Sequence, residues 1–150
     1  MKHDGYDLNR SVGFRMGLTY RKLTALFHNR LKPFELTPEQ WSVLYQIDRE
    51  EGLIQKDIAE RTGRDRPTTT RILDHLEHKG LAHRRADERD RRSYRVYATD
   101  RGRELIRDTL RLELQGNEDV RACMTEEEFE TLMRLLGNIE HHVKNILDRE

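Results

Sequence analysis

The sequence predicts a mainly α-helical protein with a small β-hairpin, organised as a winged helix-turn-helix lobe plus a helical dimerisation region. Three observations predict this fold class. Apolar residues recur at helical spacing near both ends of the 150-residue chain. Two helical segments in the middle are joined by a tight turn that contains glycine, which is the helix-turn-helix pattern. Two strand candidates follow at once, and the loop between them is rich in arginine.

The first predicted element is a long amphipathic helix from about Leu8 to Leu31. Gly13 and Gly17 lie inside it, one turn apart. Each glycine costs the helix about 1 kcal/mol relative to alanine. Either another backbone approaches closely here, or two glycines are tolerated near a frayed helix end.

The next three helices carry clear start and stop signals. Thr37 and Gln40 form a capping box ahead of a helix that runs to about residue 50. The segment IQKDIAERTG reads as a short helix that closes on Gly63. Asp65 then caps the segment RDRPTTTRILDHLEHKG, which closes on Gly80. The last two helices are the predicted helix-turn-helix.

Strands are predicted at Leu81–Arg85 and Ser93–Ala98, with the loop 86–92 between them. A helix is expected from Arg101 to Leu114, followed by a break near Gly116. The final helix begins at a second capping box and carries an apolar stripe to the end of the chain. Its members are Phe129, Leu132, Met133, Leu136, Ile139, Val143, Ile146 and Leu147.

The stripes on the first and last helices offer more apolar surface than one small core needs. A helical dimer interface is the favoured interpretation, and packing within one chain is the alternative.

Charge is unevenly distributed although the formal net charge is zero. Residues 61–95 contain eleven Lys and Arg against six Asp and Glu, whereas residues 113–140 contain two against eight. The basic segment 61–95 is therefore the candidate binding site for a polyanion, although the counts alone do not separate DNA from another anionic partner. Cys123 is the only cysteine and no signal-peptide pattern opens the chain, so a cytoplasmic location is expected.

An α-helix fits the DNA major groove, and an arginine-rich hairpin can reach the adjacent minor groove. On that interpretation the exposed start of the second helix of the motif faces double-stranded DNA. The residues expected there are Arg66, Thr68, Thr69, Thr70 and Arg71.

The ordered segments LTPEQWSVLYQI, QKDIAERTG, TTTRILDHLEHKGL and RRADERDRRSYRVYATDRG resemble the MarR family of bacterial transcription regulators, and the resemblance covers nearly the whole chain. It implies a homodimer, more often a repressor, whose two winged lobes read a palindromic operator. It also implies one domain over 1–150, with dimerisation helices at about 8–34 and 101–148 and the winged lobe at about 37–100. It matches Asp90, Arg91 and Arg92 to the wing, and Arg89 beside them is expected to bind DNA as well.

Some positions depart from the family pattern. Arg64 and Thr69 stand where aliphatic residues are more usual, and Ala98 replaces the usual leucine before a threonine. Asp74 either orients an arginine of the wing or is an ordinary solvated acid on a helix.

The resemblance also implies release of the operator by a small-molecule or oxidant signal. A tentative effector pocket comprises Tyr20, Phe27, Trp41 and Tyr45, although core packing is the default for such residues. Cys123 is either a thiol sensor or a buried or incidental cysteine.

The histidine pairs His75 with His78 and His141 with His142 lack an obvious third local ligand, so no metal and no cofactor are expected. No phosphate loop, nucleophile elbow or helical metal motif is present, so an enzyme is not expected. The alternative to a DNA-binding regulator is a winged-helix protein-interaction module without tight DNA binding.

Overall fold

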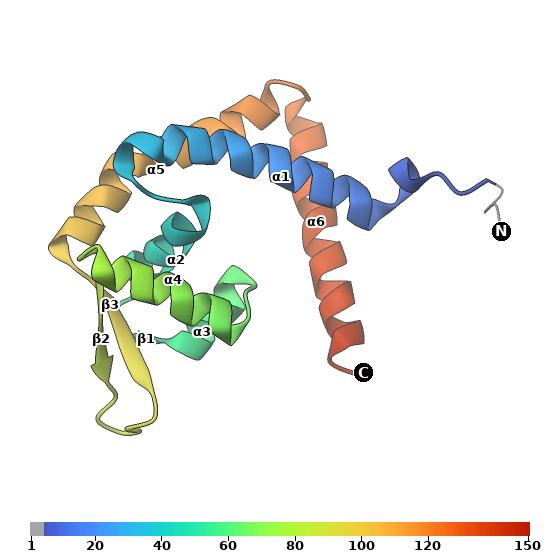
Figure 1. The fold of residues 1–150 in the computed structure, drawn as a ribbon. Coiled ribbons are helices and arrows are strands. Elements are labelled where there is room, and N and C mark those ends of the chain that lie inside the picture. Colours follow the sequence, from blue (N-terminus) through green and yellow to red (C-terminus); the bar gives the residue numbers. More distant parts are fainter. Residues whose placement is uncertain (1–4) are drawn as a thin grey trace. The chain divides into compact units, whose positions relative to one another are not determined.

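A computed structural model of the protein describes residues 5–150. The chain divides into two compact units, Met1–Glu113 and Leu114–Glu150. The helices of the first unit are α1 (Val12–Leu31), α2 (Pro38–Arg49), α3 (Gln55–Thr62), α4 (Arg66–His78) and the first part of α5 (Asp100–Arg121) (Figure 1). Its strands are β1 (Leu53–Ile54), β2 (Ala82–Ala86) and β3 (Tyr94–Ala98), and short 3-10 helices lie at Leu8–Arg10 and Lys32–Phe34. The rest of α5 and α6 (Glu126–Leu147) form the second unit. The predicted fold class, mainly helical with a small sheet, is confirmed.

The predicted helix caps are present. The Thr37 hydroxyl accepts from the backbone N–H of Gln40 at 3.1 Å, while the Gln40 side chain accepts from the N–H of Thr37 at 3.3 Å. Thr125 and Glu128 repeat this capping box at the start of α6. Each box satisfies backbone donors that a helix start leaves unpaired, which is why the starts were readable from sequence.

The predicted break near Gly116 is wrong, because α5 continues to Arg121. A glycine inside a helix costs only about 1 kcal/mol, and the helix formers around it outweigh that penalty. The chain reverses instead at residues 122–125, where Thr125 caps α6.

The sheet has the order β1-β3-β2 and both pairings are antiparallel. Strands β2 and β3 form the predicted hairpin, with Arg84 opposite Val96. Strand β1 was not predicted, because two residues, Leu53 and Ile54, are too short to show an alternating pattern. It connects α2 to α3 and fixes the start of α3 beside the hairpin.

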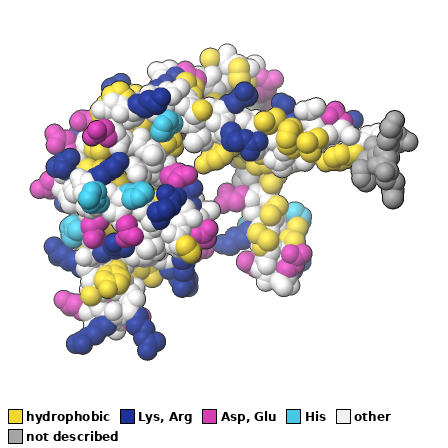
Figure 2. Space-filling model, viewed as in Figure 1, with side chains coloured by type: hydrophobic (Ala, Val, Ile, Leu, Met, Phe, Trp, Pro, Cys, Tyr) yellow, Lys and Arg dark blue, Asp and Glu magenta, His cyan; other side chains and the backbone are white. Residues whose placement is uncertain are grey.

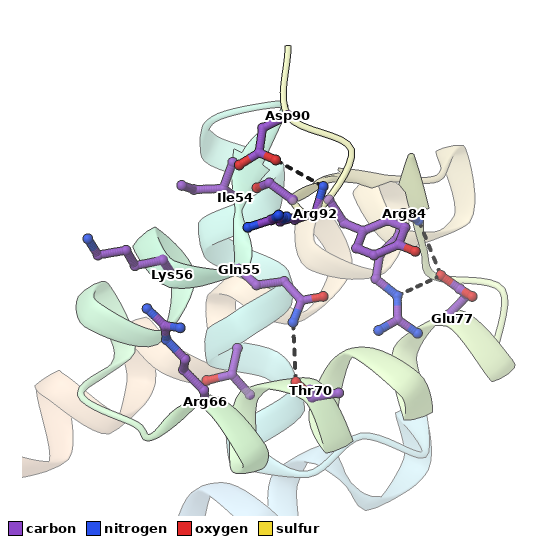
Figure 3. Close-up of a pocket in the computed structure, with 12 residues that line it drawn as sticks. Ile54, Gln55, Lys56, Arg66, Thr70, Glu77, Arg84, Asp90 and Arg92 are labelled. Atoms are coloured by element: carbon purple, nitrogen blue, oxygen red, sulfur yellow. Dashed lines mark hydrogen bonds and ion pairs between the residues drawn. The ribbon is translucent and has the colours of Figure 1, made fainter. Parts of the chain in front are cut away.

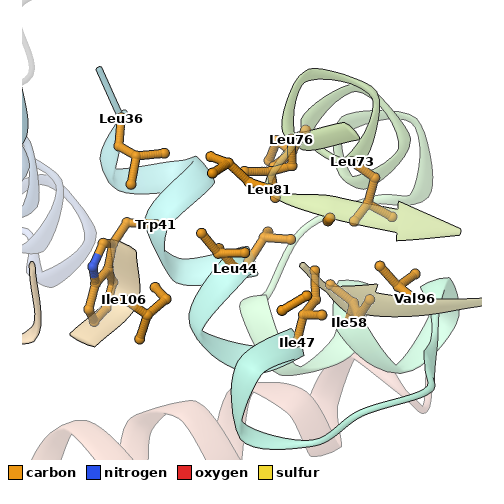
Figure 4. Close-up of a cluster of buried hydrophobic side chains, with 14 of the residues drawn as sticks. Leu36, Trp41, Leu44, Ile47, Ile58, Leu73, Leu76, Leu81, Val96 and Ile106 are labelled. Carbon is orange, nitrogen blue, oxygen red and sulfur yellow. The ribbon is translucent and has the colours of Figure 1, made fainter. Parts of the chain in front are cut away.

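The core of the first unit surrounds α2 (Figure 4). Leu44 and Ile47 of α2 are fully buried, and they belong to one apolar cluster with residues from α3, α4 and the sheet. The other large members with no more than 1% exposure are Leu31, Val43, Ile58, Ile72, Leu73, Leu76 and Val96. This cluster holds the two helices of the helix-turn-helix in a fixed arrangement.

Trp41 links α2 to α5 through a buried polar contact. Its indole N–H donates to the Thr109 hydroxyl at 2.8 Å, and that hydroxyl donates to the Leu105 carbonyl at 2.6 Å. Thr109 is fully buried. The hydroxyl therefore serves as both acceptor and donor inside the core.

Replacing Thr109 with valine should lower the free energy of unfolding by about 1–3 kcal/mol, because the indole N–H of Trp41 stays buried without an acceptor. Urea unfolding measures the change. Thr109→Ser is the control, since it keeps the hydroxyl and removes one methyl group, a loss of about 1 kcal/mol. A Thr109→Val protein as stable as the parent would contradict this role.

The start of α5 approaches the end of α4 very closely. A Cβ on Gly102 would lie 2.2 Å from the carbonyl oxygen of Leu81, a distance that no side chain tolerates. Thr99 fixes the approach by donating its hydroxyl to the Gly80 carbonyl at 2.7 Å and accepting from the N–H of Gly102 at 3.1 Å. This junction sets where the hairpin leaves the lobe.

Among residues 5–150, no backbone approaches the two glycines of α1 in this way. A Cβ on Gly13 would meet no described atom within 4 Å, and one on Gly17 would meet only the side chain of Arg21. Among residues 5–150, no helix is both long and apolar enough to cross a membrane.

Candidate nucleic-acid interface

An open groove of about 860 Å³ lies between α4, the start of α3 and the hairpin (Figure 3). Its helical wall includes Gln55, Lys56, Arg66 and Thr70, and its hairpin wall includes Arg92. The remaining lining residues are Ile54, Thr69, Glu77, Arg84, Asp90, Ser93 and Tyr94. The groove therefore joins the predicted recognition helix to the predicted wing.

The start of α4 is shaped by the Asp65 cap. The Asp65 carboxylate accepts from the backbone N–H of Thr68 at 2.7 Å, and this hydrogen bond holds the pKa of Asp65 below its ordinary value. Because the pKa is lowered in the folded state, the cap stabilises α4 at neutral pH and is lost as the pH falls through that lowered pKa. Pro67 is tolerated in this first turn, where an N–H has no helical acceptor.

The five predicted residues of α4 have different positions. Arg66 and Thr70 line the groove, and the Thr70 hydroxyl accepts from the Gln55 side chain at 3.2 Å. Thr68 is half-buried beside them. Arg71 is exposed, and its guanidinium lies 3.6 Å from the carboxylate of Glu39 on α2.

The predicted exposure of Thr69 is wrong. Its side chain is fully buried, and its hydroxyl donates to the carbonyl of Asp65 at 2.8 Å. Thr69 lies three and four residues before Ile72 and Leu73, so it belongs to the buried face of α4. It supports the floor of the groove from below.

Arg84 ties the hairpin to α4. Its guanidinium pairs with Asp74 and, at 3.2 Å, with Glu77, whose carboxylate also accepts from the backbone N–H of Arg84 at 3.2 Å. Burial opposes the charge, but the bonds to both acids raise the pKa of Arg84 overall. Of the two interpretations of Asp74, the structure therefore supports the one in which it orients a hairpin arginine.

A double-mutant cycle with Asp74→Ala and Arg84→Ala should give a coupling free energy of about 0.5–1 kcal/mol in unfolding experiments. The value is modest because half of the Asp74 side chain is exposed to solvent, which screens the pair. The coupling should fall as salt rises. Strict additivity of the two substitutions would show that the pair does not hold the hairpin.

The hairpin loop is closed by its acidic residues. Asp87 accepts from the backbone N–H of Arg89 at 3.1 Å and pairs with Arg95 at 3.3 Å, while Asp90 accepts from the N–H of Arg92 at 3.0 Å. These contacts lower the pKa of Asp87, the bond from the Arg89 backbone most strongly. Asp90 therefore shapes the loop, and it also lines the groove.

Within residues 5–150, the side chains of Arg89, Arg91 and Arg92 form no ion pair with Asp87 or Asp90. The charge of Arg89 still acts on Asp87 and helps to lower the pKa of that carboxyl. Arg92 lines the groove, Arg89 lies on the other side of the hairpin, and Arg91 is exposed. Figure 2 shows Lys and Arg side chains projecting from the tip of the hairpin.

The groove carries an excess of available positive charge. Among its acids, Glu77 is paired with Arg84, and the Asp90 carboxylate faces the Arg92 backbone. No ion pair occupies Lys56, Arg66 or Arg92 within residues 5–150. Cations spread along two walls of one groove suit a polyanion better than a single small anion.

Sequence reasoning missed Gln55, Lys56 and Tyr94 in this groove. The first two begin α3, and only the short strand β1 brings that helix start beside α4. Tyr94 opens β3 and was placed in a strand without a role. The arginine-rich composition pointed to the loop, but no sequence signal separated the inner side of the hairpin from the outer.

The four tentative effector residues lie in two separate places among the described residues. Trp41 is buried, stacks on Tyr45 with ring centroids 5.2 Å apart and meets the edge of Phe27 at 5.3 Å. These three residues pack in or against the core. Tyr20 lines a separate shallow groove of about 480 Å³ between α1 and the start of α2, together with His28.

Cys123 and the histidine pairs are the remaining candidate sites. Cys123 is exposed, which removes the buried interpretation, and its thiol donates to the Val120 carbonyl at 3.1 Å. Within residues 5–150, no three His, Cys, Asp or Glu side chains converge in a way that could hold a metal ion. His75 and His78 are exposed on α4.

Comparison with known proteins gives a consistent result. The family model described as the MarR family matches residues 36–94. The solved structure of a transcriptional repressor, CouR, bound to a 23-mer DNA duplex is 30% identical, with a TM-score of 0.80 over 89% of this chain and 94% of that chain. A probable transcriptional regulator from Pseudomonas aeruginosa is 28% identical, with a TM-score of 0.82 over 89% of this chain and 99% of that one. The transcriptional regulator SlyA is 26% identical, with a TM-score of 0.84 over 90% and 95%.

Proposed function

This chain belongs to the MarR family and is a DNA-binding transcriptional regulator, and we propose that it acts as a homodimeric repressor of a palindromic operator. The observation that carries the proposal is the groove between α4 and the hairpin, in which Lys56, Arg66 and Arg92 have no ion-pair partner among residues 5–150. The similarity to a repressor bound to a DNA duplex supports the same role.

In the proposed complex, α4 lies in the major groove and the hairpin tip reaches the adjacent minor groove. Arg66 and Thr70 face base edges or phosphates from α4, and Gln55 shares the Thr70 hydroxyl from α3. Arg91 and Arg92 reach the minor groove, where negative potential favours arginine. Arg71 and Thr68 are placed at the edge of this contact.

The exposed apolar faces support the homodimer. Figure 2 shows apolar side chains gathered along α1, and the helix presents Val12, Met16 and Leu23 to solvent. On α6 only Phe129 is buried, although the helix is strongly amphipathic. The exposed apolar residues of α6 are Met133, Leu135, Ile139, Val143, Ile146 and Leu147. A second copy would remove these two faces from water, so we place dimerisation in the helices at about 8–34 and 101–148.

A two-fold symmetric dimer should read two half-sites whose centres lie about one helical turn, roughly 10 base pairs, apart. Inserting roughly 5 base pairs between them turns one half-site to the opposite side of the duplex, so specific binding should fall to the non-specific level. Binding is measured on the parent and expanded duplexes, and sedimentation at the same protein concentration reports the dimer. Undiminished binding to the expanded duplex would contradict a symmetric dimer.

Signal release belongs to the same proposal. The shallow groove beside Tyr20 is also lined by Glu39, which pairs with Arg71 of α4. A small molecule bound there would displace the start of α2 and, through this pair, α4. Such a ligand changes DNA affinity only if it binds the two conformations unequally. An oxidant acting at Cys123 is the second route, and release by oxidant that persists in Cys123→Ser would exclude it.

The alternative function, a winged-helix protein-interaction module, predicts no tight binding to any duplex. Saturable, sequence-dependent binding at physiological salt separates the two.

A further inference from the structure

The hairpin has a second basic side that faces away from α4. Residues alternate between the two faces of a strand, so Arg85 and Arg95, which are directly paired, point opposite to Arg84. Together with Tyr97 and residues 86–89, they line a hollow of about 430 Å³ on this outer side. The groove described above lies on the inner side.

Arg95 is committed to the fold of the hairpin. Its guanidinium donates to the carbonyl of Gly52 at 2.8 Å and pairs with Asp87 at 3.3 Å. Asp87 is in turn fixed by the backbone N–H of Arg89. The charges of Arg95 and Asp87 cancel, so Arg95 is a positioning residue. The positive charge of the hollow comes from its neighbours.

Arg85 and Arg89 are the available cations of the outer side. The Arg85 guanidinium lies 5.4 Å from the centroid of the Tyr97 ring, which is itself stacked on His83 at 5.4 Å. An aromatic ring orients a guanidinium without cancelling its charge, unlike a carboxylate. The Arg89 side chain has no ion pair among residues 5–150. Of the two acids that line the hollow, Asp87 is bonded, whereas Glu88 has no hydrogen bond or ion pair within residues 5–150.

The positive charge of the outer side and its continuity with the groove both favour DNA as the molecule that binds there. The minor groove is bounded by two phosphate strands, so a hairpin that reaches it presents one face to each strand. The inner face carries Arg92, and the outer face carries Arg85 and Arg89. Because the outer face points away from α4, the strand that it meets lies outside the half-site that α4 reads.

We propose that Arg85 and Arg89 bind the phosphate backbone of the DNA that flanks each half-site, and that the Tyr97 ring holds Arg85 ready for this contact. The proposal rests on the function proposed above. It makes part of the affinity depend on flanking DNA whose bases are never read.

The test uses duplexes selected by the parent protein from a random-sequence pool. One duplex is trimmed to the selected bases, and the other extends them by about half a helical turn, roughly 5 base pairs, on each side. Fluorescence anisotropy is recorded for the parent and for Arg85→Ala/Arg89→Ala at several salt concentrations. In dilute salt, the double variant should bind the extended duplex more weakly than the parent by about tenfold or more. The slope of the logarithm of the binding constant against the logarithm of the salt concentration should be shallower by about 2 for each hairpin that makes both contacts. On the trimmed duplex the two proteins should bind alike.

Three further variants test whether the loss of affinity comes from charge. Arg85→Lys should retain the salt slope, because lysine still neutralises a phosphate. Glu88→Gln should strengthen binding to the extended duplex, because it removes a repelling carboxylate. Arg107→Ala, an exposed arginine of α5, should leave both duplexes bound as by the parent.

Suppose that the parent binds its selected site. The proposal would be overturned if the Arg85→Ala/Arg89→Ala protein lost the same affinity on both duplexes, or lost no affinity on either. The proposal would also be overturned if Arg85→Lys had the same shallow salt slope as the Arg85→Ala/Arg89→Ala protein. If instead the parent selected no duplex at all, the proposed function itself would fail.

Discussion

Arg66→Ala combined with Arg92→Ala is expected to weaken binding to the selected operator by about 2–6 kcal/mol per half-site, the sum of about 1–3 kcal/mol for each groove contact. The two side chains lie on opposite walls of one groove and come from separate elements, α4 and the hairpin loop. Neither has an ion-pair partner within residues 5–150, so their removal leaves no buried acid unpaired. The fold should therefore survive while DNA affinity is lost.

Titration of operator and scrambled duplexes at several salt concentrations measures this loss. A contact to phosphate lowers the salt slope by about 1 for each arginine removed, whereas a contact to a base changes the ratio of specific to non-specific binding. Thr70→Ala should alter sequence preference with little change in slope. Parent-like affinity of the double variant at every salt concentration would show that this groove does not face DNA.

Gly102→Ala is expected to lower the free energy of unfolding by about 3 kcal/mol or more, since it forces a methyl group onto backbone that has no room. The added Cβ would lie 2.2 Å from the Leu81 carbonyl oxygen and 3.3 Å from Leu44. Either α5 moves away from the end of α4, or the Leu81 carbonyl turns and loses its bond from the N–H of Thr99 at 3.0 Å. Urea unfolding followed by circular dichroism measures the change.

Gly116→Ala in the same helix is the matched control. Among residues 5–150, no atom lies within 4 Å of a Cβ placed there, so alanine should stabilise the helix by about 0.5–1 kcal/mol through its higher helix propensity. A Gly102→Ala protein as stable as the Gly116→Ala protein would show that the close approach imposes no constraint.

Much of the fold could be predicted because its signals are local. The capping residues Thr37, Asp65 and Thr125 announced three helix starts, and the periodic apolar residues of α4 fixed its buried face. The break expected near Gly116 failed because a single glycine is a weak helix breaker, so α5 continues past it.

The candidate site was predicted only in outline. Helix position and arginine content located α4 and the loop, but they could not show which side of each element is open. Thr69 was expected to face DNA, yet its spacing from Ile72 and Leu73 places it inside. Lys56 enters the groove only because β1 pairs with β3, a long-range contact that local patterns do not report.

In the hairpin, the direction of single side chains could not be predicted from the sequence either. The loop was expected to place Asp90 with the arginines that face DNA, but the Asp90 carboxylate accepts from the backbone N–H of Arg92, and Asp87 binds the Arg89 backbone and Arg95. Arg84 turned inward to α4 and Arg85 turned outward, a difference of one residue that only the strand register decides.

Selection of bound duplexes from a random-sequence DNA pool by the purified protein tests the central claim most directly. We predict enrichment of an imperfect palindrome whose half-site centres lie about 10 base pairs apart, bound saturably at physiological salt. Recovered duplexes that share no sequence, and that are bound no better than the starting pool, would contradict the assignment of this groove to sequence-specific DNA recognition.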